Sequence, residues 1–237
     1  MFLSKTRFNE ILDPNSPEFA LSIQPLAPNY VGADSIDFRL GETFAVYENS
    51  LPRGIKPWTP VKSDGNYSFY EWYESPLEYV RDIFRPAHYA INPKYALDPA
   101  KKRKTIEIKI PETGLIVRPG VFYLAHLYEF TAQKNVSGLL EGLSGMARNS
   151  VKIHFTAPFV HSGQGWDKQL NQPKDGKGQQ LTLEIECSIP TILYPRQKIA
   201  QMYFFETPTD LDLYSGKHSF QSGATASRMN QEMQNSH

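Results

Sequence analysis

Short runs in which apolar and polar residues alternate recur along most of the chain. An alternation with a period of two is typical of β-strands that bury one face. The runs that we expect to form strands are SIDFRLG, FAVY, TIEIKI, GLIVRPG, VFYLAHLYEF, VKIHFTA, LTLEIEC, TILY and KIAQMYFFE. The prolines and glycines between these runs favour a sandwich or barrel over alternating βαβ units. The sequence therefore predicts a mainly β fold.

Two segments show helical spacing instead. Residues 6–12 carry apolar side chains at helical spacing before an Asp-Pro pair, so we expect a short helix near the N-terminus. Residues 75–84, with Ser75 as candidate N-cap and a proline in the first turn, match a second short helix.

Three further segments are predicted to be irregular. Residues 51–73 are rich in Pro, Gly and aromatic residues, and they suit either an insertion packed on the barrel or a stacking platform for a base. Residues 164–178 are polar and contain glycines, so we expect a long surface loop. Residues 215–237 are small and polar, and we expect a mobile tail unless a ligand orders it.

Composition limits the classes of partner. At 237 residues and 40% hydrophobic content the chain can bury one full core. Lys plus Arg and Asp plus Glu each number 25, so no long-range field attracts nucleic acid or an anionic membrane. We expect neither partner.

Cys187 is the only cysteine, which excludes an intramolecular disulfide and any zinc site with several cysteines. On a strand it is expected to be a small buried apolar residue. The N-terminus does not resemble a signal peptide, and no run approaches the roughly 20 apolar residues that span a bilayer. We expect a cytoplasmic protein.

The motifs of several enzyme classes are absent. The chain has no GxxxxGK[ST] loop, no GxGxxG after a strand, no GxSxG elbow and no HExxH. The six histidines are scattered without metal-ligand spacing. The H-x-E and P-C-x-x-C pattern of zinc nucleobase deaminases cannot be built with one cysteine.

Glu184 stands inside the alternating run LTLEIEC, and two interpretations of it are open. If one face of the strand is exposed to solvent, the polar side chains of the run point into solvent while the apolar ones pack inward. Alternatively, the side chain is buried, and a buried ionisable side chain usually has a charged or hydrogen-bonding partner or a functional role. The preceding small-residue turn, which carries Ser144 and Arg148, favours the second interpretation.

Seven short segments are informative because of the order in which they occur along the chain. They are MFLS (1–4), ADSIDFRLG (33–41), RPGVFYLAHLYEF (118–130), EGLSGMAR (141–148), QQLTLEIE (179–186), YPRQKIAQMYF (194–204) and YSGKHSFQSGATASR (214–228). Each is weak alone, but together they resemble the metal-free dCTP deaminases of the dUTPase superfamily.

The resemblance implies a distorted jelly-roll β-barrel of the dUTPase-like type with a short N-terminal helix. It implies a single domain over residues 1–237, with an insertion around 51–104 and a C-terminal lid around 214–237. It also implies a homotrimer with sites at subunit interfaces, where Glu184 of one chain faces turn residues of its neighbour.

The implied activity is hydrolytic deamination of the deoxycytidine nucleotide dCTP to dUTP and ammonia. Glu184 matches the family's general acid/base. Arg148 matches the arginine that orients this carboxylate and stabilises developing charge. Ser144 and the carbonyl of Ala157 match positions that hold the attacking water.

Other matched residues concern the nucleotide. The amides of Gly145 and Met146 lie in a turn that can cradle phosphate oxygens as a nest. Tyr214, Lys217 and Gln221 match tail residues that close over the nucleotide. Magnesium is expected to enter with the phosphates rather than in a protein cage, and no zinc is expected.

Three positions depart from the family's pattern. Leu143 replaces an arginine that contacts phosphate, and Gly145 replaces a serine. The aspartate of the third motif falls within 161–163, which is His-Ser-Gly here. The missing carboxylate argues against hydrolysis at phosphorus. Two alternatives stay open, namely a dUTP pyrophosphatase and a non-catalytic nucleotide-binding regulatory homologue.

Overall fold

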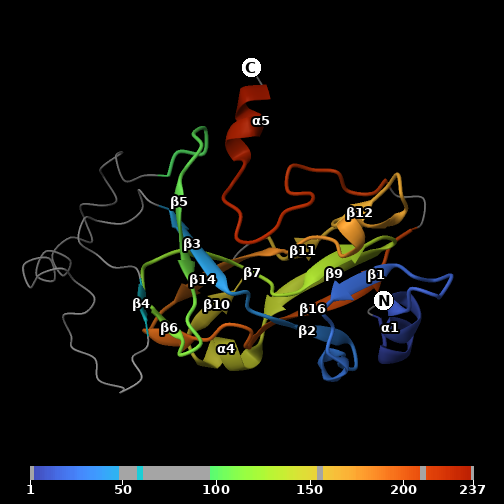
Figure 1. Ribbon diagram of the computed structural model, residues 1–237, viewed down its shortest axis with the longest axis horizontal. Helices are drawn as coiled ribbons and strands as arrows, with labels where there is room; N and C mark the ends of the chain where they lie inside the picture. The colour runs from blue at the N-terminus through green and yellow to red at the C-terminus, as the bar shows by residue number, and fades with distance from the viewer. Residues whose placement is uncertain (1–2, 48–57, 61–96, 154–156, 209–211, 236–237) are drawn as a thin grey trace, which may run out of the picture.

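The computed structural model describes residues 3–47, 58–60, 97–153, 157–208 and 212–235 of the protein (Figure 1). It is mainly β with a short N-terminal helix, α1 (Lys5–Leu12), whose N-cap Ser4 accepts a hydrogen bond from the Arg7 amide. The predicted fold class and N-terminal helix are confirmed. The helix expected at 75–84 and most of the 51–104 insertion lie outside the described residues.

Two antiparallel sheets dominate the described structure. The strands of the five-stranded sheet, in spatial order, are β10 (Val151–Ile153), β14 (Thr182–Cys187), β7 (Tyr123–His126), β3 (Thr43–Tyr47) and β5 (Thr105–Lys109). Those of the four-stranded sheet are β11 (Phe159–Val160), β9 (Val136–Gly142), β16 (Lys198–Glu206) and β2 (Ser35–Arg39). Neighbours in this order are far apart in sequence, so the sheets form only when distant segments meet.

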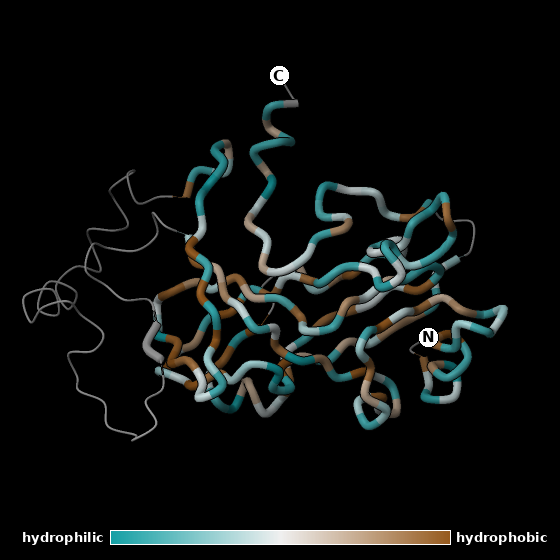
Figure 2. The backbone as a smooth tube through the Cα atoms, in the orientation of Figure 1, coloured by the Kyte–Doolittle hydropathy of each residue, from teal (hydrophilic) through white to brown (hydrophobic). Residues whose placement is uncertain are grey.

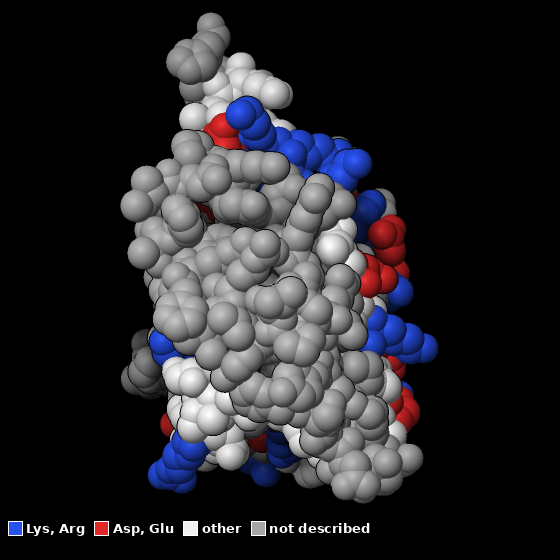
Figure 3. Space-filling view, turned by 90° about the vertical axis from the view of Figure 1, so that its left-hand side faces the viewer, with Lys and Arg blue, Asp and Glu red and all other residues white. Residues whose placement is uncertain are grey.

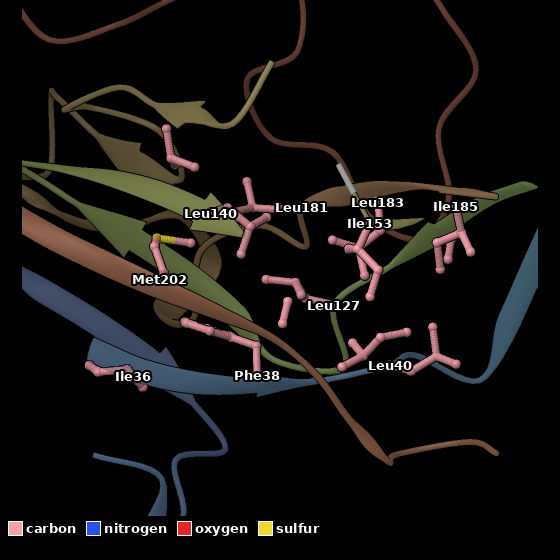
Figure 4. Close-up of a cluster of buried hydrophobic side chains, with 14 of the residues drawn as sticks. Ile36, Phe38, Leu40, Leu127, Leu140, Ile153, Leu181, Leu183, Ile185 and Met202 are labelled. Carbon is pink, nitrogen blue, oxygen red and sulfur yellow. The ribbon is translucent and has the colours of Figure 1, made fainter. Parts of the chain in front are cut away.

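The core lies between these sheets. Figure 4 shows apolar side chains converging from both, including Ile36, Phe38 and Met202 on one side and Ile153, Leu183 and Ile185 on the other. All are buried. Because full burial of one such side chain stabilises the fold by about 1.5–3 kcal/mol, this shared core holds the two sheets together. In Figure 2 the strands around it are the most hydrophobic part of the backbone.

Smaller elements complete the described fold. The remaining strands pair as β1 (Leu21–Gln24) with β8 (Phe130–Gln133), β12 (Trp166–Asp167) with β13 (Gln172–Pro173), and β6 (Leu115–Val117) with both β15 (Thr191–Leu193) and β4 (Trp58–Pro60). The short helices are η1 (Pro28–Tyr30), α4 (Ser144–Arg148), η4 (Lys174–Gly176) and α5 (Met229–Asn235). The described strands pair as separate sheets rather than as one closed ring, so the barrel is a distorted one.

A buried ion pair links two of the segments singled out in the sequence. Glu129 is 1% exposed, and its carboxylate accepts hydrogen bonds from the Nε (2.6 Å) and the backbone amide (3.0 Å) of Arg39. The Arg39 guanidinium also lies over the rings of Tyr30 and Tyr128. A buried carboxylate is tolerated because it is paired and hydrogen-bonded in this way.

Residues 164–178 differ from the predicted surface loop. They form the β12–β13 hairpin and η4, and Trp166 within them is only 1% exposed, packed against Phe19. Gly165 has a φ of 71°, and a Cβ there would lie 2.2 Å from the Thr131 carbonyl oxygen. The polar composition of the segment concealed both the buried tryptophan and this close backbone approach.

The strand β9 and the helix α4 were also not predicted. The sequence indicated a small-residue turn around 144–146, whereas Val136–Gly142 forms a strand that pairs with β16 and Ser144–Arg148 forms one helical turn. A Cβ at Gly138 would lie 2.4 Å from the Met202 sulfur, so a larger residue there would require the Met202 side chain on the paired strand β16 to move. The strand β9 was not predicted because it contains glycines, which are depleted in strands.

No helix within the described part of the chain has the length and apolar character needed to cross a bilayer.

Candidate active site

Buried and half-buried side chains alternate along β14, and this alternation sets the direction of the Glu184 side chain. Leu183 and Ile185 are fully buried in the core, and Glu184 between them points to the outer face of the five-stranded sheet. Through the cross-strand register, Glu184 lies opposite Leu124 of β7, which lies opposite Ala45 of β3. The prediction that one face of LTLEIEC packs inward is therefore confirmed.

The C-terminal tail, residues 212–235, covers this outer face instead of leaving it to solvent (Figure 1). Four of its amides donate hydrogen bonds to side chains of β3, β14 and the residues that lead into β14. The pairs are Phe220 with Gln179 Oε1 (2.6 Å), Gly223 with Gln180 Oε1 (2.9 Å), Thr225 with Thr182 Oγ1 (3.2 Å) and Ser227 with the Tyr47 hydroxyl (3.1 Å). The tail that we expected to be mobile is thus docked along β14.

A cavity of about 450 Å³ remains between the tail and the sheet. Its walls come from β3, β7, β11, β14 and the tail, and the half-buried Glu184 side chain contributes to its lining. Among the described residues that line it, Glu184 is the only Asp or Glu, and none is a Lys or Arg. The carboxylate therefore stands in a cavity that shields it in part from bulk water.

A pair of stacked rings closes one side of the cavity. The His161 ring lies parallel to the Tyr214 ring, with centroids 5.2 Å apart and an angle of 9° between the ring planes, and the Phe159 ring meets His161 edge-on at 4.7 Å. The Tyr214 amide donates a hydrogen bond to the Ser162 carbonyl (2.8 Å). The first turn of the tail is thus anchored beside the position where the family's aspartate was expected.

A second histidine, His218 of the tail, also lines the cavity. Burial, and after it the positive charges of Lys217 and Arg228, lower the pKa of His218, while the charge of Glu184 acts in the opposite direction. His218 is therefore held mainly neutral near pH 7, and its imidazole can accept or donate a hydrogen bond next to the carboxylate.

The structure brings together only part of the predicted site. Glu184, Ala157, Tyr214 and Gln221 line the same cavity. Gln221 is buried, and its carbonyl accepts a hydrogen bond from the Gln180 amide (3.1 Å).

The residues of α4 lie elsewhere. Figure 1 shows α4 at the opposite end of the molecule from the C-terminal tail, and Ser144, Gly145 and Arg148 on it are exposed. Half-buried Met146 packs against the core, and its amide already donates a hydrogen bond to the Leu143 carbonyl (2.9 Å). In the single chain this amide is therefore used within α4, and the expectation that it is directed at phosphate stays a prediction.

Lys217 does not line the cavity either. Its Nζ lies 2.6 Å from the Glu232 carboxylate of α5, and its carbonyl accepts a hydrogen bond from Arg228. The two cations of the tail are thus held against other tail residues. Sequence reasoning missed His161 and His218, for which the only signal was position: one replaces the family's aspartate and the other lies within the matched tail.

No group of three or more His, Cys, Asp or Glu residues suited to hold a metal ion occurs among the residues that the structure describes. A magnesium ion that arrives on the phosphates of a nucleotide needs few ligands from the protein, because Mg²⁺ retains waters and binds phosphate oxygens. The described lining of the cavity offers one carboxylate, two imidazoles, two side-chain amides and aromatic walls.

Comparisons with known proteins identify the family. The family model described as dCTP deaminase-like matches residues 79–207. The chain is 35% identical over 177 residues to a protein of Clostridium beijerinckii named "dCTP deaminase, dUMP-forming", covering 74% of this chain and 87% of that protein. A protein of Nanoarchaeum equitans with the same name is 26% identical over 235 residues, covering 97% of this chain and 98% of the other. The chain therefore belongs to the dCTP deaminase-like family.

Among solved structures, the 2′-deoxycytidine 5′-triphosphate deaminase from Agrobacterium tumefaciens is similar, with a TM-score of 0.47 and 15% identity. The match covers 86% of this chain, which spans 47% of that longer chain.

Proposed function

We propose that this protein hydrolytically deaminates dCTP, with Glu184 as the general acid/base. The observation that supports the proposal best is the placement of Glu184 as the single carboxylate among the described residues lining the tail-covered cavity. The matched family and the names of the relatives support the choice of substrate. The tail limits access of bulk water, which strengthens electrostatic interactions within the cavity.

The reaction replaces the amino group at C4 of cytosine with oxygen. Glu184 takes a proton from a water molecule as the water oxygen bonds to C4, and passes that proton to N3. The tetrahedral intermediate then loses its amino group as ammonia after a second proton transfer, leaving the C4 carbonyl of uracil. Such positioned proton transfer contributes on the order of 10²–10⁴-fold to the rate. Ala157 lines the same cavity, and we propose that its carbonyl holds the attacking water.

Glu184→Gln tests this role, with Glu186→Gln as a matched control. Both residues lie on the same face of β14, but Glu186 lies opposite Lys152 of β10 and does not line the cavity. We expect ammonia release from dCTP to fall at least about 10²-fold in Glu184→Gln and to be nearly unchanged in Glu186→Gln. Equal activity of Glu184→Gln and the wild type would rule out the role.

We further propose that the complete site needs a second copy of the chain, in a homotrimer. The described lining of the Glu184 cavity contains no Lys or Arg, whereas Arg148 is exposed on α4 at the far end of the same chain. A neighbouring subunit can supply this guanidinium to orient Glu184 and stabilise developing charge, with Ser144 beside it.

Subunit mixing tests this arrangement. Glu184→Gln and Arg148→Gln are each expected to be inactive alone. If the subunits exchange at random in equal amounts, about a quarter of the sites regain both native residues and activity returns. No recovery in a mixture whose subunits are shown to exchange would mean that the site lies within one chain.

The phosphate chemistry of the product separates two versions of the function. Release of dUTP fits the 161–163 segment, which carries no carboxylate. Formation of dUMP with loss of pyrophosphate is favoured by the relatives, which are named dUMP-forming. Chromatography of the products of dCTP distinguishes them: ammonia with dUTP, or ammonia with dUMP and pyrophosphate. Pyrophosphate from dUTP without any ammonia from dCTP would identify a pyrophosphatase, and binding without product would identify a regulatory homologue.

A further inference from the structure

The C-terminal tail meets the body of the protein at a pair of stacked rings. His161 lies in the loop after β11, Tyr214 lies near the start of the tail, and both line the Glu184 cavity. Their rings are parallel within 9°, with centroids 5.2 Å apart. An aromatic contact of this geometry stabilises a structure beyond the apolar area that it buries. The imidazole is therefore a flat surface against which the first ring of the tail rests.

Two further rings continue the stack toward the sheets. The Phe159 ring of β11 meets the His161 ring edge-on, with centroids 4.7 Å apart, and the Phe205 ring of β16 lies 5.7 Å from that of Phe159. The four rings form a series of aromatic contacts that runs from β16 through β11 to Tyr214. Phe159 is 43% exposed, so this series lies at the surface rather than in the core between the sheets. His161 is the member of the series that joins the body to the tail.

The backbone of His161 is held by contacts that do not involve the tail. Its amide donates a hydrogen bond to Gln164 Oε1 (2.9 Å), and its carbonyl accepts one from Gln133 Nε2 (3.1 Å). Gln133 is 1% exposed, and its Nε2 also donates to the Val160 carbonyl (2.8 Å). Breaking such bonds would leave buried polar atoms without partners, which is costly. The loop therefore presents the imidazole in a fixed position.

The same loop is shaped to admit the tail backbone. Gly163 has a φ of 101°, and a Cβ there would lie 2.4 Å from the Tyr214 backbone nitrogen. Glycine adopts this φ without strain and leaves room for the tail. The close approach allows the Tyr214 amide to donate its hydrogen bond to the Ser162 carbonyl (2.8 Å). Ring stacking and backbone contact thus fix Tyr214 independently.

The other end of the tail is held by charged groups. The Lys217 Nζ lies 2.6 Å from the Glu232 carboxylate of α5, and the Arg228 guanidinium donates to the Lys217 carbonyl. Figure 3 shows Lys and Arg side chains gathered beside the C-terminal segment. Salt screens ion pairs with exposed partners, and the Glu232 side chain is 59% exposed. The contacts of Tyr214 include no ion pair, so the two ends of the tail should respond differently to salt.

We propose that His161 is a positioning residue, which holds Tyr214, and through it the entry of the tail, against the Glu184 cavity. Where the family's pattern has an aspartate, this chain has an aromatic contact with its own tail. The position of the tail follows from the contacts above, whereas the consequence for deamination rests on the proposed function. A displaced entry would admit bulk water beside Glu184 and weaken the electrostatic interactions within the cavity.

His161→Ala tests the role, and His161→Phe is its matched control because phenylalanine keeps a flat ring without the ring nitrogens. The readout is native-state hydrogen exchange of the Tyr214 amide, which reports local opening of the tail. We expect exchange about fivefold faster in His161→Ala and close to the wild-type rate in His161→Phe. Unchanged exchange in His161→Ala, or equal acceleration in both variants, would overturn the proposal. Equal acceleration at Leu183 in β14 would also overturn it, since His161 would then support the whole fold.

Tyr214→Ala removes the same stack from the side of the tail, where it cannot disturb the loop that carries His161. Because both single variants lose one shared contact, His161→Ala/Tyr214→Ala should open the entry of the tail no more than the weaker of the two single variants does. Effects that add in the double variant would show that the two rings act separately, and would refute the stack as the cause. The neighbouring Leu213 amide reports the opening in all of these variants.

The charged end of the tail supplies a second control. Glu232→Gln removes the ion pair with Lys217, and roughly 0.5 M salt screens it, but neither change should alter exchange at Tyr214. If either change opened the entry as much as His161→Ala does, the charged end would hold the whole tail, and the proposal would fail.

Kinetics connect the position of the tail to the reaction. The kcat/KM for ammonia release from dCTP should fall about fivefold in His161→Ala and recover in His161→Phe, in parallel with the exchange rates. The pH profile of His161→Phe should match that of the wild type, whereas a proton-transfer role of the imidazole would change it. A wild-type kcat/KM in His161→Ala would remove the link to catalysis. A wild-type protein without deaminase activity would refute the proposed function and leave the exchange results intact.

Discussion

Replacement of Gln180 by methionine should loosen the C-terminal tail without unfolding the sheets beneath it. The Gln180 Oε1 accepts hydrogen bonds from the Gly223 amide (2.9 Å) and the Ser222 hydroxyl (3.3 Å) of the tail. Methionine has nearly the same shape but cannot accept these bonds at full strength. Gln180 is 8% exposed, so water replaces the lost acceptor only when the tail leaves the sheet.

The size of the effect follows from these two bonds. A hydrogen bond of normal length contributes about 1 kcal/mol net, and the longer one to the hydroxyl contributes less. The free energy of tail docking should therefore fall by about 1.5 kcal/mol, which is about tenfold in the equilibrium between docked and open tail. Gln180 Nε2 also donates to the Leu127 and Tyr128 carbonyls, and the loss of these bonds lowers the stability of the body in both tail states.

Native-state hydrogen exchange separates the two effects. Amides of 220–227 should exchange about tenfold faster in Gln180→Met, because exchange there reports local opening. Gln24→Met is the control, since the Gln24 side chain also makes two hydrogen bonds, to Ser22 and Gly176, away from the tail. Equal acceleration at Leu183 in β14 would mean that the tail opens only when the whole protein unfolds, and unchanged exchange at 220–227 would mean that Gln180 does not hold the tail.

Two other predictions concern stability. Burial lowers the pKa of His126, whose Nδ1–H donates to the Leu127 carbonyl and whose Nε2 accepts from Thr43. Since the unfolded chain takes up the proton first, urea denaturation should show full stability above about pH 6.5 and a loss as the pH falls below it, and a flat profile would contradict this assignment. Gly165→Ala should destabilise the protein by about 3 kcal/mol or more, because its φ of 71° and the Thr131 carbonyl both exclude a methyl group; an unchanged melting temperature would show that the hairpin can move away.

The elements that were predicted well are those whose pattern is local. The period of two in LTLEIEC and KIAQMYFFE survives in the burial of β14 and β16, because each strand has one face on the core whatever its partners are. β9 and the hairpin at 164–178 were missed, since the glycines of β9 and the polar residues around Trp166 make sense only against β16 and β8. Their partners are distant in sequence.

The features of the candidate site likewise fall into those that the sequence predicts and those that require the tertiary structure. The sequence by itself determined that Glu184 leaves the apolar face of its strand and that one cysteine cannot build a zinc deaminase site. Only the tertiary structure decided that the tail turns this outer face into a cavity, that His161, His218 and Tyr214 share it, and that α4 lies away from it. The physical reason is that alternation sets which way a side chain points along a strand, whereas enclosure depends on hydrogen bonds between the tail and the sheet that no local pattern encodes.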